Sequence, residues 1–173
     1  MKTKLFAATC AALALAAGTA QAGSIITQTT PAGALALFGA ADSLTFDSVA
    51  AGTYSSLTQG LLTFTSDTGA LHVDGAYMNQ YNNFGVNSVH SCYCGDSFGE
   101  LYFTFSTAIE GFGFFWGASD NQWTLTAYNA ANAVVESFAL PITHQSNAGD
   151  FVGIFGAGIT HATLKGPSSD YVF

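Results

Sequence analysis

The amino-acid sequence predicts an all-β protein, an antiparallel β-sandwich or jelly roll that follows a signal peptide. Apolar and polar residues alternate with a period of two, most clearly at Leu101, Phe103 and Phe105, which is the pattern of a strand with one buried face. Clusters of Gly, Asn and Asp, which form turns, separate the alternating segments. After residue 22 no segment gives a convincing helical pattern. About nine to eleven short strands are expected.

The first 22 residues predict a secretory signal peptide. Lys2 and Lys4 precede an apolar, alanine-rich run from Leu5 to Ala17, and Ala20-Gln21-Ala22 places small residues at the −3 and −1 positions. The apolar run is about 13 residues long, whereas a permanent transmembrane helix needs about 20. We therefore expect cleavage before Gly23 and a single secreted β-sandwich domain formed by residues 23–173.

The expected strands follow the alternation along the chain. The first covers residues 24–28, and the segment 34–38 fits a short helix as well as a strand. The remaining strands are expected at 43–47, 60–66, 101–106, 109–116, 123–128, 133–140, 151–155 and 159–164, with a last strand beginning at Asp170. Residues 51–53 interrupt the alternation, and 67–95, which is rich in turn-forming Asn, is expected to be loose. Gly111 and Gly113 predict a close backbone approach or a bulge.

The charge of the mature chain excludes nucleic acid as a partner. Lys165 is the one Lys or Arg left after cleavage, against 11 Asp and Glu, which gives a net charge of −10. Nucleic-acid binding needs several cationic contacts with phosphate, and anionic membrane surfaces have the same requirement. The mature sequence also contains no apolar run long enough to span a membrane.

A series of strand-and-turn segments has a recognisable pattern. The segments are Leu44-Thr45-Phe46-Asp47 with Ala51-Gly52-Thr53, Phe103 to Ile109 leading into Gly111-Phe112-Gly113-Phe114, Trp123 to Tyr128, and Phe151-Val152-Gly153-Ile154 with Ile159. Together they resemble the secreted β-sandwich domains of bacterial PEP-CTERM proteins, which are sorted by exosortases. The resemblance covers roughly residues 42–173. It implies a non-catalytic protein of the cell surface or extracellular matrix of a Gram-negative bacterium.

The end of the sequence departs from that family. Family members close their last strand with an Ile-Asp-Asp/Asn-hydrophobic run, followed by a Pro-Glu-Pro element, a transmembrane helix and a basic tail, whereas this sequence ends at Asp170-Tyr171-Val172-Phe173. We expect a truncated gene product whose last strand is incomplete; a family member that is released is the alternative. Because an open strand edge is a template for another chain, a self-associating structural matrix protein is an alternative function.

Cys92 and Cys94 are expected to form a disulfide. Two cysteines in an oxidising compartment favour a bridge, and a small kink would bring the pair within reach from a separation of ~6.6 Å between Cα atoms. Free or intermolecular thiols are a second interpretation. A third is a zinc-type site, because His90, Cys92, Cys94 and Asp96 share one face of an extended segment.

Acidic residues at strand ends suggest a structural calcium ion. Calcium takes 6–8 oxygen ligands, and Asp47 and Asp170 would approach each other if the first and last strands pair. Solvated turn carboxylates are the alternative interpretation, since the sequence contains no D-x-D-x-D-G loop. Apart from calcium, we expect no cofactor.

An aromatic and amide-rich loop suggests glycan binding. Tyr77, Asn79, Tyr81 and Asn82 combine rings that stack on sugars with amides that bond hydroxyl groups, so extracellular polysaccharide is the expected partner. An ordinary surface loop would have the same composition. A carbohydrate-active enzyme with Glu100 and Asp120 in a cleft is a further alternative, although no carboxylate pair and no G-x-S-x-G element stands out. We therefore expect no catalytic residue.

Overall fold

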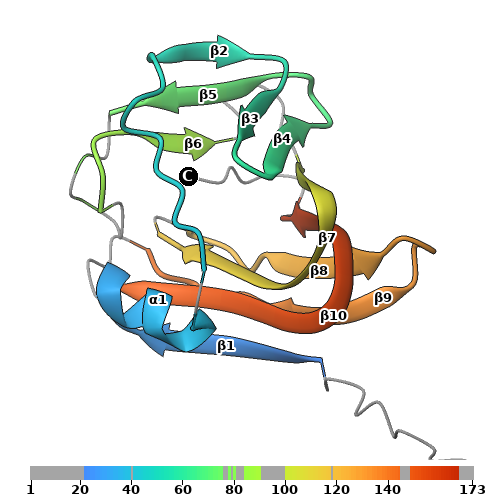
Figure 1. Ribbon diagram of the computed structural model, residues 1–173. Coiled ribbons are helices and arrows are strands. Elements are labelled where there is room, and N and C mark those ends of the chain that lie inside the picture. Colours follow the sequence, from blue (N-terminus) through green and yellow to red (C-terminus); the bar gives the residue numbers. More distant parts are fainter. Residues whose placement is uncertain are drawn as a thin grey trace, which may run out of the picture.

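The computed structural model describes residues 22–39, 41–75, 78, 80, 84–90, 100–117, 119–144 and 149–167. Two antiparallel sheets and one short helix make up the described part of the chain (Figure 1), which confirms the all-β sandwich. The elements are β1 (Gly23–Gln28), α1 (Pro31–Phe38), β2 (Gly52–Tyr54), β3 (Leu57–Gln59), β4 (Leu62–Ser66), β5 (Leu71–Asp74), β6 (Ser88–His90), β7 (Leu101–Phe115), β8 (Thr124–Asn129), β9 (Val134–Ala139) and β10 (Asp150–Lys165). Among the helices of this described part, none is long and apolar enough to cross a membrane.

The larger sheet is built on two long neighbouring strands, β7 and β10. Its strand order is β3-β4-β7-β10-β8-β9, and β1 pairs with the first half of β10. The second half of β10 pairs with β8, from Ile159 opposite Asn129 to Lys165 opposite Thr124. The smaller sheet has the order β2-β5-β6.

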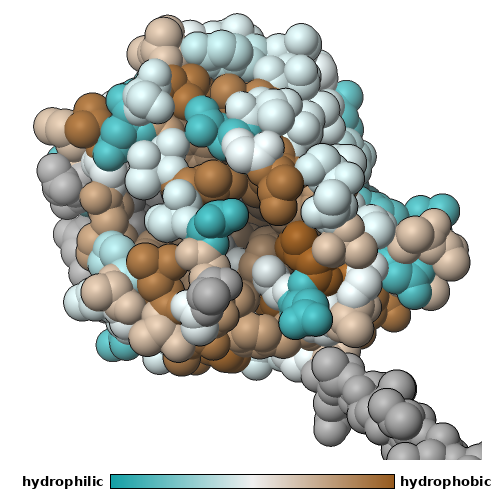
Figure 2. Space-filling view, in the orientation of Figure 1, coloured by the Kyte–Doolittle hydropathy of each residue, from teal (hydrophilic) through white to brown (hydrophobic). Residues whose placement is uncertain are grey.

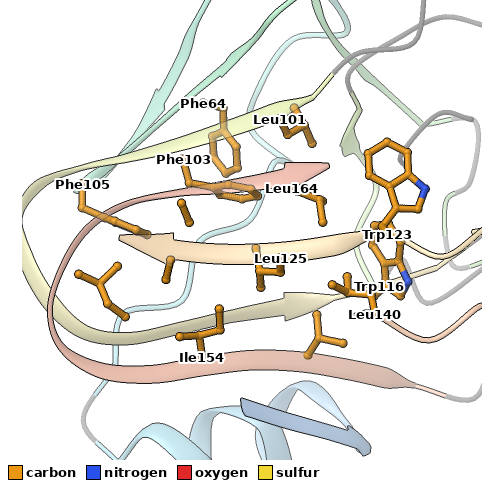
Figure 3. Packing of buried hydrophobic residues seen from close by; sticks show 14 of the residues in the cluster. Phe64, Leu101, Phe103, Phe105, Trp116, Trp123, Leu125, Leu140, Ile154 and Leu164 are labelled. Atoms are coloured by element: carbon orange, nitrogen blue, oxygen red, sulfur yellow. The ribbon is translucent and has the colours of Figure 1, made fainter. Parts of the chain in front are cut away.

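Both long strands bend, and the larger sheet thereby folds over its own core. The register of β10 shifts between Phe155 and Ile159, and Gly158 in that interval has φ +77°, which favours glycine. The two halves of β7 face each other across the bend: the rings of Phe105 and Phe112 are 5.1 Å apart, and those of Phe103 and Phe114 are 5.8 Å apart. Figure 3 shows Ile154 and Leu164, from the two halves of β10, pointing into the enclosed space together with Phe103 and Phe105 of β7.

The core joins the two sheets and holds both tryptophans. Leu71 and Val73 of β5 are buried in the same cluster as Leu125 of β8. Trp116 and Trp123 are each 1% exposed, and their rings meet edge to face at 6.0 Å. The indole Nε1 of Trp116 donates to the Pro141 carbonyl at 2.8 Å, which satisfies its polar atom inside the core.

The glycines of β7 and β10 provide the close approach that the sequence predicts. Gly113 pairs with Gly153 across the two strands, and a Cβ atom at Gly113 would lie 2.7 Å from the Val152 carbonyl oxygen. At Gly153 a Cβ would lie 3.1 Å from the ring of Phe38, which belongs to α1. Phe38 also stacks on Phe155 with 4.5 Å between ring centroids. The missing side chains thus let α1 cover this part of the sheet.

Several expected elements differ in the structure. Residues 31–38 form a helix, because Thr30 caps it by accepting a hydrogen bond from Gly33 N at 3.2 Å and Pro31 suits the first turn. The alternating segment 43–47 is not a strand, since Asp47 fixes it to another loop, as described below. The regions expected to be a break and a loose segment contain β2, β5 and β6, and β3 lies between that break and the strand expected at 60–66.

Other strand predictions are confirmed with changed boundaries. The expected strands 101–106 and 109–116 form the single strand β7, and 151–155 and 159–164 form β10. A period-two pattern does not separate one bent strand from two straight strands joined by a turn. The signal peptide and the strand expected from Asp170 lie outside the described residues.

Candidate functional site

Most of the predicted site residues lie outside the part of the chain that the structure describes. These residues are Tyr77, Asn79, Tyr81, Asn82, Cys92, Cys94 and Asp170. Asp47 is described, so its environment bears on the calcium prediction.

Asp47 fastens two segments of the chain together. Its Oδ1 accepts hydrogen bonds from Val86 N at 2.6 Å and from Asn87 N at 3.4 Å. In the other direction, the Asn87 amide donates to the carbonyls of Phe46 at 3.4 Å and Val49 at 2.9 Å. The carboxylate therefore has a structural role in the described part of the chain. No three His, Cys, Asp or Glu side chains of that part converge as a metal ion would need, and a calcium ion shared with Asp170 stays a prediction.

An apolar cavity of about 280 Å³ lies behind this connection. Residues 43–47 and 84–89 contribute to its lining, and Phe64, Phe103, Phe114, Trp116 and Leu164 contribute aromatic and aliphatic walls. Figure 2 shows apolar residues around a hollow on the same side of the molecule. A ring or an acyl group would suit this lining better than a sugar, because few polar groups are available to bond hydroxyls.

The outer surface of the larger sheet carries two rows of hydroxyl-bearing and aromatic side chains, which we call the hydroxyl face. Each row crosses five neighbouring strands, because its members are direct cross-strand partners. The first row is Thr58, Thr63, Thr104, His161 and Tyr128, and the second is Thr65, Tyr102, Thr163, Thr126 and Ser137. These positions alternate with buried residues such as Phe64, Phe103 and Leu164, so they point away from the core.

Hydrogen bonds and ring contacts organise the hydroxyl face. Thr126 Oγ1 and Ser137 Oγ lie 2.8 Å apart, and Thr58 Oγ1 and Thr63 Oγ1 lie 2.9 Å apart. The rings of Tyr128 and His161 stack at 5.0 Å with an interplanar angle of 9°. The face therefore presents oriented hydroxyls beside a flat aromatic pair.

A shallow groove of about 540 Å³ runs over the centre of the hydroxyl face. Tyr102, Thr104, His161 and Thr163 line it from β7 and β10, and Asn132 of the β8–β9 turn contributes to one wall.

An ion pair lies at one end of the hydroxyl face. Lys165 Nζ contacts Glu100 Oε1, and the hydrogen bond to Glu100 raises the pKa of Lys165. The Tyr102 hydroxyl donates to Glu100 Oε2 at 3.4 Å. Burial, followed by the negative charges of Glu100 and Asp67, raises the pKa of Tyr102. Tyr102 is thus neutral at physiological pH, and Glu100 pairs with Lys165, the one Lys or Arg that follows residue 22 in the sequence.

The smaller sheet contains a second polar arrangement, around His90. His90 lies directly opposite His72 across β5 and β6, and the two rings stack at 5.4 Å. His90 is 3% exposed, and its Nε2 lies 3.1 Å from Asp74 Oδ2. Sequence reasoning placed His90 with the cysteines that follow it, and it missed His72 and Asp74 because strand pairing is not visible in the sequence.

Glu100 and Asp120, the carboxylates considered for catalysis, contact different residues. Glu100 contacts Lys165 and Tyr102, whereas Asp120 Oδ1 lies 3.2 Å from His144 Nδ1 on an exposed loop. Neither carboxylate is among the described residues that line the cavity or the groove.

Sequence reasoning also missed the hydroxyl face. The available signal was threonine or tyrosine at outward positions of successive strands, as at Thr63 and Thr65 or at Tyr102 and Thr104.

No family model, curated protein or solved structure was found to match this chain.

Proposed function

We propose that this chain is a secreted, non-catalytic β-sandwich protein that binds neutral extracellular polysaccharide through its hydroxyl face. The predicted signal peptide supports secretion. The resemblance to PEP-CTERM domains supports a place at the surface or in the matrix of a Gram-negative bacterium.

One observation carries the binding proposal: hydroxyl and aromatic side chains stand side by side on five neighbouring strands. A hydroxyl both donates and accepts hydrogen bonds, as a sugar hydroxyl does, so either orientation of a bound sugar finds a partner. Neighbouring strands are ~4.8 Å apart, so the spacing between successive side chains in a row is similar to the width of a sugar ring. Tyr102 and the Tyr128–His161 pair add apolar ring surfaces against which the C–H face of a sugar can pack.

The electrostatics favour a neutral glycan over an acidic one. Lys165 is engaged with Glu100, and the mature chain carries 11 carboxylates. An acidic polysaccharide would be repelled, whereas a neutral one loses little solvation on a surface of uncharged hydroxyls.

Polysaccharide pull-down with a glycan array, carried out on the exported protein, tests the proposal. We expect retention on at least one neutral glycan. The substitution Tyr102→Ala should weaken retention about tenfold, which corresponds to ~1.4 kcal/mol of lost stacking. Thr163→Val, which removes one hydroxyl and keeps the shape of the side chain, should weaken it by a factor of about 2–10.

Two further substitutions, neither at a lining residue of the groove, provide the comparison. Thr45→Val removes an exposed hydroxyl from the 43–47 segment and should leave retention unchanged. Tyr81→Ala tests the loop that the sequence predicts to bind. Loss of retention in Tyr81→Ala but not in Tyr102→Ala would move the site to that loop, and no retention on any glycan would refute the binding function.

A further inference from the structure

Strand β1 forms an open edge of the larger sheet. It pairs with β10 along its whole length, from Gly23 opposite Phe155 to Gln28 opposite Asp150. On its other side, no strand of the described chain pairs with it. In Figure 1 it lies at the lower margin of the fold.

This edge lacks the features that usually prevent two sheets from pairing. Edge strands are commonly protected by charged side chains, proline, a bulge or short length. β1 is six residues long, contains no charged residue and no proline, and keeps a continuous register with β10. The backbone donors and acceptors on its outer side are therefore presented as a regular row.

The other edges of the two sheets are better protected. β9, also six residues long, carries Glu136 in its middle, and its register with β8 shifts between Ala127 and Tyr128. β2, β3 and β6 are three residues each. β1 is thus the edge on which a further strand would meet the least opposition.

The chain segment that contains β1 and α1 is also free of charged side chains and largely apolar. No charged residue occurs from Gly23 to Ala41. Three large apolar side chains of this segment are exposed: Ile26 at 50%, Leu35 at 39% and Leu37 at 42%. In a mature chain with 11 carboxylates and one Lys, this segment is a place where two copies can approach without one carboxylate facing another.

We propose that β1 pairs with β1 of a second copy of this chain, antiparallel and about a two-fold axis, so that the larger sheet continues from one copy into the other. A two-fold arrangement uses the same patch on both partners, which suits an uncharged strand because no opposite charges have to be matched. Helix α1 begins after only two intervening residues, and its exposed Leu35 and Leu37 add apolar area beside the paired strands. The hydroxyl face lies on other strands, so this inference does not depend on glycan binding.

Sedimentation velocity over a range of protein concentrations tests the proposal. We expect the exported wild-type protein to form dimers as its concentration rises. Ile26→Lys introduces a charge on the exposed side of β1 and should raise the dissociation constant about tenfold or more. Leu61→Lys is the matched control: Leu61 is 47% exposed in the turn between β3 and β4, at the opposite edge of the larger sheet, and its substitution changes the net charge by the same amount but should leave dimerisation unchanged.

Hydrogen exchange on the wild-type protein provides a measurement that does not depend on a variant folding. The β1 amides that point away from β10 should gain protection with increasing concentration, while the remaining amides of β1 are protected throughout. A monomer at every concentration would overturn the proposal. Dimers that Ile26→Lys does not weaken, or that form without added protection in β1, would overturn it as well.

Discussion

Replacing Gly113 with Ala tests the close packing between β7 and β10. The new Cβ would lie 2.7 Å from the Val152 carbonyl oxygen and 2.8 Å from Cε1 of Phe151. Both distances are shorter than van der Waals contact, and one of the atoms belongs to the backbone of the paired strand. The strand or the Phe151 ring must therefore move.

The expected cost follows from that overlap. Overpacking a close-packed site by one methyl group costs about 1–3 kcal/mol. In a domain of this size 1 kcal/mol corresponds to about 2–4 °C, so Gly113→Ala should lower the unfolding temperature by about 2–12 °C. Fluorescence of Trp116 and Trp123, both buried, reports the transition.

Gly23→Ala is the control for this substitution. Gly23 is also a glycine of the larger sheet, but a Cβ there meets no atom within 4 Å, so its stability should be unchanged or slightly raised. The double variant Gly113→Ala with Phe151→Leu should recover part of the loss, because the smaller side chain relieves one of the two contacts. Equal unfolding temperatures for Gly113→Ala and the wild type would refute the close approach of the two strands.

Three further predictions concern charge, calcium and the cysteines. The raised pKa values of Tyr102 and Lys165 mean that the folded chain holds these protons more tightly than the unfolded chain. The stabilisation that these two protons give is therefore complete below about pH 10 and is lost as the pH rises through the raised pKa values. In denaturant unfolding between pH 9 and 12, a Tyr102→Phe variant should lose less stability with rising pH than the wild type does. Asp47→Asn should lower the free energy of unfolding by about 1 kcal/mol, and the exposed Asp42→Asn is its control. Any rise in unfolding temperature that calcium produces in the wild type should disappear in Asp47→Asn but not in Asp42→Asn. Thiol alkylation with mass spectrometry of the exported protein should find no free thiol at Cys92 and Cys94 before reduction, whereas two labelled thiols would contradict the predicted disulfide.

The inward side chains of the larger sheet were predictable from sequence. Phe103, Phe105 and Leu101 lie on one face in any straight strand, because the side-chain period of a strand is two. Their burial required only that this face be the apolar one. The pairings were not predictable, since β1 meets a partner more than 120 residues away along the chain and no local pattern encodes that distance.

The candidate site was less predictable than the core. An outward threonine such as Thr163 is ordinary for a half-exposed strand. It becomes part of a surface only when Tyr102 and Thr126 are placed beside it by strand order and register. Segment 43–47 shows the opposite error, because its alternation is that of a strand, whereas the hydrogen bonds of Asp47 to Val86 and Asn87 hold it as a loop.

The pairing of β1 with β10 has a consequence for the order of events during synthesis. β1 is the first described strand to leave the ribosome, and its partner is the last. At about 5–20 residues per second, the roughly 120 intervening residues take about 6–24 s to be made. Throughout that interval β1 has no partner strand on either side.

The chain therefore cannot complete its larger sheet until translation is nearly finished. Such non-local pairing also slows folding itself, because the closure of a long loop precedes any gain from the contacts. A chain that stays open for seconds suits passage through a translocation channel in the unfolded state. The same delay leaves the uncharged β1 open to pairing with a neighbouring nascent chain until β10 has been made.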